Sequence, residues 1–254
     1  MRQHIDTIPL WDAYKTDCEC PLCKIRSQNE AMYVENFLGA SVMEPDTRVE
    51  VNQKGYCPHH FQMMFDAGNR LGLALMTHTY LKETMQKVEV LSKEALSAAG
   101  EQASKPLPAR LISKIGAKKE DGLTAAAIKI EETTQTCILC ERLNATMERY
   151  LYTLLYLWRK ESEFRKAFAS SKGLCLPHYA QLLKMAPEEL SGQELSEFVK
   201  TLTTLMHDNL ARIEKELEWF TLKFDYRNQD KPWGNSQDAV ERSINKLRGH
   251  TVEG

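Results

Sequence analysis

The sequence lacks long apolar runs and any strong bias of charge. No window approaches the roughly 18 consecutive apolar residues of a membrane-spanning helix, and Met1 to Leu10 has neither the basic start nor the apolar centre of a signal peptide. The 33 basic and 35 acidic side chains give a net charge of −2 and a pI of about 6.4, which gives no sign of the strongly basic face that non-specific nucleic-acid binding requires. We expect a cytoplasmic protein without nucleic-acid or membrane partners, which binds an unidentified protein or small molecule.

Common catalytic motifs are missing as well. The chain contains no G-x-G-x-x-G, no phosphate-binding G-x-x-x-x-G-K-[ST], no H-E-x-x-H and no G-x-S-x-G. The 254 residues, 43% of them hydrophobic, are nevertheless enough to bury a sizeable core. We therefore favour an interaction or ligand-binding module over an enzyme.

Cysteine is present in an ordered arrangement. Cys20-Pro21-Leu22-Cys23 is followed after 33 residues by Cys57-Pro58-His59-His60, and Cys137-Ile138-Leu139-Cys140 is followed after 34 residues by Cys175-Leu176-Pro177-His178. Both halves thus read C-x-x-C, spacer, C-x-x-H, and a Lys-Gly pair precedes the third cysteine of each half. Six of the seven cysteines fall into this internal repeat, and Cys18 is left over.

The repeated residues have the chemistry of a metal site. Three thiolates and one imidazole are a typical ligand set for structural zinc, and a two-residue gap lets both members of a pair face one ion. The alternatives are iron–sulfur clusters, redox dithiols, and cysteines that serve packing alone. We predict two zinc sites with the ligands Cys20, Cys23, Cys57, His60, Cys137, Cys140, Cys175 and His178.

The pairing of the motifs is open at this stage. Each half could bind its own ion, or the C-x-x-C of one half could combine with the C-x-x-H of the other. We favour a site within each half, because it requires only one hairpin to close. Prolines in or beside the motifs place each pair at a helix N-terminus, where the helix dipole favours thiolates. Complete four-ligand sites leave no position for a substrate, so we do not expect them to be catalytic.

Apolar residues recur at three- and four-residue spacing through both halves, as in amphipathic helices. The pattern runs over residues 143–158 and 195–220 in the second half, and over 25–38 and 71–91 in the first. This predicts an all-α, internally duplicated helical bundle built from two metal-pinned hairpins. The expected organisation is a first repeat (1–96), a linker (97–122), a second repeat (123–225), and a loop with a C-terminal helix (226–254).

Several local features are less regular. The segment 46–54 alternates weakly and could be extended, and the linker is expected to hold at most a short helix around Leu111. A loop is expected over 225–234. Ser236 is a candidate N-cap for a final helix that ends at Gly249.

Four further residues are candidates for the sites. His59 aligns with Pro177, so we expect a polar residue at a helix start, although it could replace His60. Cys18 is expected to be a free thiol, with an alternative role as a ligand. His78 and His207 could orient a ligand, but a histidine satisfied beside the core is the preferred interpretation.

Several segments together resemble a known family. They are Asp6 to Tyr14 (D-T-I-P-L-W-D-A-Y), Cys20 to Cys23, Met43 to Asp46, Lys54 to Cys57, and Arg242 to Gly249 (R-S-I-N-K-L-R-G). With them the chain resembles an uncharacterised family of bacterial, mostly anaerobe-borne proteins that is classed as a domain of unknown function. The cysteine and histidine positions match that family, so the resemblance implies a common site without naming its task.

Overall fold

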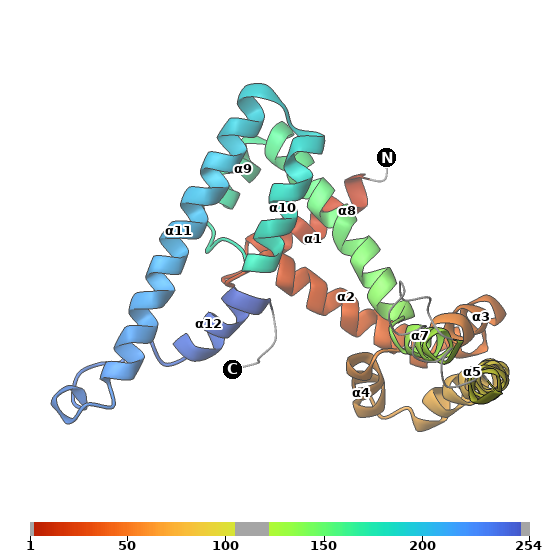
Figure 1. Cartoon of the computed structure of the whole chain (residues 1–254). Coiled ribbons are helices and arrows are strands. Elements are labelled where there is room, and N and C mark those ends of the chain that lie inside the picture. Colours follow the sequence, from red (N-terminus) through yellow and green to blue (C-terminus); the bar gives the residue numbers. More distant parts are fainter. Residues whose placement is uncertain (1–2, 105–121, 250–254) are drawn as a thin grey trace. The chain divides into compact units, whose positions relative to one another are not determined.

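The computed structural model describes residues 3–104 and 122–249, and over these ranges it contains helices and no strands (Figure 1). The protein is therefore all-α, as predicted. The α-helices are α1 Gln3–Tyr14, α2 Pro21–Leu38, α3 Pro45–Lys54, α4 Pro58–Asp66, α5 Arg70–Ser104, α7 Gly122–Thr134, α8 Ile138–Lys160, α9 Ser162–Ser170, α10 Leu176–Glu189, α11 Gly192–Leu222 and α12 Ala239–Arg248. The 3₁₀-helices are η1 Ala40–Met43 and η2 Tyr226–Asn228.

The chain folds into two compact units that do not follow its order. Unit 1 comprises residues 1–30 and 143–254, and unit 2 comprises residues 31–142. The divisions fall inside α2 and α8. Unit 1 therefore contains the start of α2 with most of α8, whereas unit 2 contains the start of α8 with the end of α2. Each unit therefore contains residues of both sequence repeats.

The core of unit 1 forms where the amphipathic stripes of α8 and α11 meet the short helices α9 and α10. Trp158 of α8 packs edge-on against Phe198 of α11, with ring centroids 5.1 Å apart, and Phe168 of α9 lies on the same ring. Burial of these large apolar side chains is the main favourable term in folding. The predicted stripes are thus confirmed in unit 1; its fully buried apolar side chains include Leu10, Leu22, Leu143, Leu154, Phe164, Phe168, Leu174, Leu182, Phe198 and Leu202.

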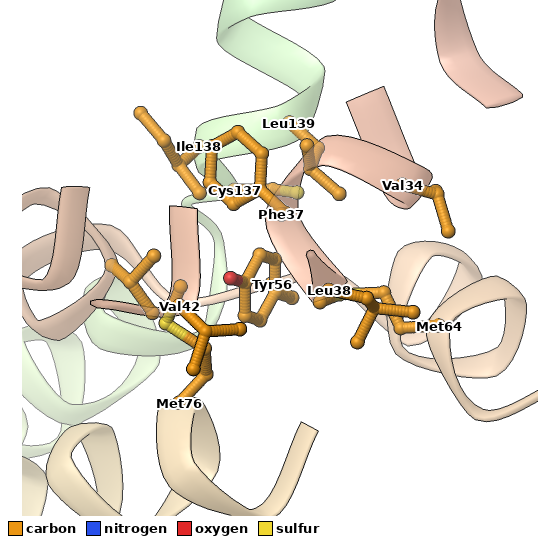
Figure 2. Packing of buried hydrophobic residues seen from close by; sticks show 11 residues of the cluster. Val34, Phe37, Leu38, Val42, Tyr56, Met64, Met76, Cys137, Ile138 and Leu139 are labelled. Carbon is orange, nitrogen blue, oxygen red and sulfur yellow. The ribbon is translucent and has the colours of Figure 1, made fainter. Parts of the chain in front are cut away.

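The core of unit 2 is centred on Tyr56, which lies among Phe37 of α2, Met76 of α5 and Ile138 of α8 (Figure 2). The rings of Phe37 and Tyr56 meet edge to face at 6.2 Å. The long helix α5 packs against α3 and α7 in the same unit. Tyr56 and Ile138, which lie next to the predicted ligands Cys57 and Cys137, are therefore part of the core.

Three local expectations were wrong. Residues 46–54 lie in helix α3, because Pro45 occupies its first turn and Asp46 favours the positive end of the helix dipole. The expected linker is helical at both described ends, since α5 continues to Ser104 and α7 begins at Gly122. The N-cap of α12 is Asp238, and Ser236 lies two residues before it.

Other local expectations have different outcomes. The predicted end of α12 at Gly249 is confirmed, with a φ of 89° that glycine adopts readily. The expected loop over 225–234 contains only η2, and the Lys223 ammonium donates to three of its carbonyl groups. The expected short helix around Leu111 lies outside the described residues.

Within the described part of the chain, none of the helices combines the length and the apolar character that crossing a bilayer requires.

Candidate metal centres

In unit 1, four ligand-type side chains converge on one buried point. They are Cys20, Cys23, Cys175 and His178, here called site 1. The Nδ1 of His178 lies 3.5 Å from the Sγ of Cys20, 3.5 Å from that of Cys23 and 3.1 Å from that of Cys175. The two sulfurs of Cys23 and Cys175 are 3.4 Å apart. All four residues are buried.

In unit 2, the other four predicted ligands form an equivalent group. Cys57, His60, Cys137 and Cys140 are here called site 2. The Nδ1 of His60 lies 3.2 Å from the Sγ of Cys57, 3.3 Å from that of Cys137 and 3.4 Å from that of Cys140. The sulfurs of Cys57 and Cys140 are 3.7 Å apart. His60 and Cys137 are buried, whereas Cys57 and Cys140 are partly exposed.

The preferred pairing within each half was wrong. Each site takes its C-x-x-C from one repeat and its C-x-x-H from the other. The reason is the length of the first helix of each repeat: at about 1.5 Å per residue, α2 carries the chain about 27 Å and α8 about 35 Å from the C-x-x-C. The helices that follow, α3 and α9, are too short to return over that distance, about 15 Å and 14 Å respectively.

All four motifs begin helices, as predicted, although only three of them contain a proline and Cys137-Ile138-Leu139-Cys140 contains none. The carbonyl of each leading cysteine accepts the first bond of its helix, from the N–H four residues on; these cysteines are Cys20, Cys57, Cys137 and Cys175. A ligand at the N-cap and a ligand three residues later lie on neighbouring positions of the first turn. The free N–H groups and the dipole of the helix favour negative sulfur at this position.

Backbone N–H groups also contact the sulfurs directly. The N–H of Cys23 donates to the Sγ of Cys20 at 3.4 Å, and the N–H of Cys140 donates to the Sγ of Cys137 at 3.5 Å. Hydrogen bonds of this kind stabilise the thiolate form over the thiol. The two C-x-x-C segments therefore have the same local geometry.

Glycines lead the chain into both C-x-x-H motifs. Gly55 and Gly173 have φ values of 63° and 77°, in the region that residues with a Cβ rarely adopt. A Cβ on Gly55 would lie 2.4 Å from the ring of Tyr80. The Lys-Gly pair noted in the sequence therefore forms a turn, and this turn positions the cysteine that follows, Cys57 or Cys175, in its site.

The thiols in each group affect one another strongly. Burial raises the pKa of Cys137, but hydrogen bonds with His60 and with backbone N–H groups outweigh burial and lower the pKa to about 6. Burial and the neighbouring Cys137 raise the pKa of Cys140 to about 12. The hydrogen bond with Cys20 is the main cause that raises the pKa of Cys175 to about 12. The thiols of Cys140 and Cys175 are therefore protonated at neutral pH unless a cation lies beside them.

Site 1 borders a network of charges that sequence reasoning missed. Glu19, directly before Cys20, receives two hydrogen bonds from Arg212 at 2.6 and 2.8 Å, and Arg242 binds both Glu19 and Glu216. The Nζ of Lys246 donates to the backbone oxygen of Glu19. The partners of Glu19 lie on helices α11 and α12. In the sequence they have the spacing of ordinary solvated charges, so no pattern distinguished them.

The four additional candidates lie outside both sites. His59 is exposed, as expected at a helix start, and its ring lies 5.2 Å from the ring of His60. His78 and His207 are also exposed, so the interpretation that they lie beside the core was wrong. Cys18 is half-buried and its Sγ lies 4.0 Å from the carbonyl oxygen of Ala13.

Buried phenols lie near the cysteines of both units. The hydroxyl groups of Tyr14 in unit 1 and Tyr56 in unit 2 are buried and have no hydrogen-bond partner among the described residues. Burial is the main cause that raises the pKa of both, and the neighbouring cysteine, Cys20 or Cys137, adds to the effect. Both hydroxyl groups therefore stay protonated next to their sites.

The donor set fits a single ion in each site. A tetrahedral ion with bonds of about 2.3 Å to sulfur and about 2.0 Å to nitrogen separates its ligand atoms by about 3.5–3.8 Å. The separations in the two sites, 3.1 to 3.7 Å, are close to these values. Each group of four could thus hold one metal ion.

Comparison with known proteins identifies the family. No curated protein and no solved structure matches the chain significantly. A family described as "Family of unknown function (DUF6062)" matches residues 1–254. The whole chain therefore belongs to this uncharacterised family, as the resemblance implied.

Proposed function

We propose that the protein is a structural zinc protein in which two tetrahedral Zn²⁺ ions, one per unit, hold a helical interaction or ligand-binding module together. The observation that carries the proposal is the convergence of three sulfurs and one Nδ1 in each unit at separations close to those of one tetrahedral ion. Each ion ties residues of one repeat to residues of the other, so metal binding contributes directly to folding.

Zinc is favoured over other metals by the ligands. Thiolates and imidazole are soft to intermediate ligands that suit Zn²⁺, while Mg²⁺ and Ca²⁺ prefer oxygen. The ligand atoms in both sites lie close together, whereas an iron–sulfur cluster with several irons and sulfides needs its ligand sulfurs farther apart. Four protein ligands complete a tetrahedron, which supports a structural role and argues against catalysis at these ions.

A redox dithiol is the second candidate, and one observation favours it. Cys57 and Cys140 are partly exposed and their sulfurs are 3.7 Å apart, close enough for a disulfide to form after a small movement. In this alternative, site 2 would cycle between dithiol and disulfide in anaerobic metabolism.

Elemental analysis of protein purified without oxygen distinguishes the candidates. Two zinc ions per chain in a colourless protein support the proposal. A brown protein with iron and sulfide would establish the iron–sulfur alternative, and a metal-free protein with a reversible disulfide at Cys57 would establish the dithiol alternative. Removal of the metal with a chelator should also lower the melting temperature.

The proposed module requires a surface for a partner. A groove of about 650 Å³ lies between α9 and α11 of unit 1, lined by Trp158, Arg165, Lys200, Thr201 and Thr204 among others. The guanidinium of Arg165 lies over the Trp158 ring, 4.3 Å from its centroid. A small molecule that binds here should raise the melting temperature of the wild type, and Thr201→Trp, which fills the groove, should abolish that rise.

The cysteines also support a reducing compartment. All seven are free thiols, and six of them are arranged for a metal. We propose a cytoplasmic location on this basis, because thiol-rich metal sites persist where disulfides are kept reduced.

A further inference from the structure

The two sites differ in how their ligand loops are joined. In site 2 the joint is direct: the Thr136 hydroxyl donates to the backbone oxygen of Lys54 at 2.7 Å, and the N–H of Ile138 donates to that of Gly55 at 3.1 Å. These two bonds connect the segment before the C-x-x-C helix with the segment before the C-x-x-H helix. The ligands of site 2 are thereby held together even before a metal binds.

The same joint cannot form in site 1. By the alignment of the repeats, Glu19 replaces Thr136 and Pro21 replaces Ile138, while Lys172 and Gly173 provide the matching carbonyl groups. An ionised carboxylate has no proton to donate, and proline has no backbone N–H. Both donors that join the loops in site 2 are therefore missing from site 1.

Lys246 of α12 occupies this gap. Its Nζ donates to the backbone oxygen of Glu19 at 2.9 Å and to the backbone oxygen of Lys172, and it lies 3.3 Å from the Glu19 carboxylate. The side chain is 0% exposed. A buried ammonium is unfavourable unless its donors are satisfied, and here three acceptors meet its three N–H groups.

The neighbouring residues fix this lysine in position. Arg242, one turn before Lys246, binds Glu216 of α11 as well as Glu19. Arg212 of α11 binds the same two carboxylates. These ion pairs hold helix α12 against both α11 and the loop before Cys20. Lys246 is therefore fixed within reach of the carbonyl groups of Glu19 and Lys172.

We propose that Lys246 is a positioning residue for site 1: it bridges the two ligand loops in place of the direct bonds of site 2, so that metal retention at site 1 depends on α12. The inference rests on the proposed metal binding. Outer residues that orient ligands typically change metal affinity about 10- to 100-fold when they are replaced.

Alkylation followed by mass spectrometry tests this in the whole protein, because each cysteine is identified in its own peptide. With a competing chelator present, Lys246→Met should increase the alkylation rate of Cys20, Cys23 and Cys175 about tenfold and leave the cysteines of site 2 unchanged. The matched variant Thr136→Val should affect Cys57, Cys137 and Cys140 only. No increase at site 1, or equal increases at all six cysteines, would overturn the proposal.

A rescue variant separates bridging from general stability. Adding Pro21→Ile to Lys246→Met restores an N–H that can donate to Gly173, as Ile138 does to Gly55. Recovered protection of the site 1 cysteines supports bridging, and no recovery contradicts it. Elemental analysis of the same samples keeps the two claims apart: a wild type without metal refutes the proposed function, whereas a wild type with two ions and an unaffected Lys246→Met variant refutes only the role of Lys246.

Discussion

The Nδ1 of His178 lies 3.5 Å from the Sγ of Cys20, although 158 residues separate them in the chain. His60, only 40 residues beyond Cys20, belongs to the other site. Candidate ligands that are neighbours in sequence thus belong to different sites, and pairs of substitutions can reveal this arrangement.

Double variants should count the sites. Cys20→Ala combined with His178→Ala should leave one zinc per chain, because both changes fall in site 1. Cys20→Ala combined with His60→Ala should leave none, since each change removes a different ion. Elemental analysis gives the result, and the reverse outcome would restore the pairing within each repeat.

Loss of one thiolate should destabilise its own unit. Cys140→Ser should release the ion of site 2 and lower the free energy of unfolding by several kcal/mol, because metal binding is coupled to folding. Zinc content and thermal unfolding measure the effect. Cys18→Ser is the control and should leave both unchanged, because Cys18 lies outside the two sites; a loss of zinc in the control would make Cys18 a ligand.

The two sites should differ in reactivity. Cys57 and Cys140 are partly exposed, whereas Cys20, Cys23 and Cys175 are buried. A chelator and an alkylating reagent should therefore attack site 2 of the native protein first. Peptide mass spectrometry over time checks the order, and earlier labelling at Cys175 would contradict it.

Metal binding should depend on pH. In the metal-free protein the pKa values of Cys140 and Cys175 are raised to about 12, so both thiols are protonated at neutral pH. Zinc must displace these protons, and its affinity should rise with pH and fall on acidification. Zinc added to metal-free protein in weak buffer should acidify the solution; an unchanged pH would show that the thiols are already ionised.

The turn before Cys57 should tolerate no side chain. Gly55→Ala combines a positive φ with a Cβ 2.4 Å from the Tyr80 ring, so we expect a loss of about 2–4 kcal/mol in the free energy of unfolding. Gly68 has a φ of 84°, and a Cβ added there would meet no atom of the described residues within 4 Å beyond its chain neighbours. The matched variant Gly68→Ala should lose only about 1–2 kcal/mol, and equal losses in chemical denaturation would show that the contact with Tyr80 is unimportant.

The sequence was sufficient for the fold class, the long helices and the eight candidate ligands, because apolar periodicity and motif spacing are local signals. It was insufficient for the pairing, which depends on how far α2 and α8 carry the chain. The contribution of Lys246 was also beyond local patterns, since a buried lysine and an exposed one look alike in a helix. Segment 46–54 was misread because its weak alternation was given more weight than Pro45.

The ligand pairs are nested along the chain: the pair of motifs at 57–60 and 137–140 lies between those at 20–23 and 175–178. During synthesis from the N-terminus, all the residues of site 2 are present once Cys140 has been made. Site 1 is incomplete until His178 has been made. Site 2 can therefore close on the ribosome before site 1 has all its ligands. Cys20 and Cys23, both buried in the finished protein, are therefore the ligand-type thiols that stay without their partners longest while the chain is made.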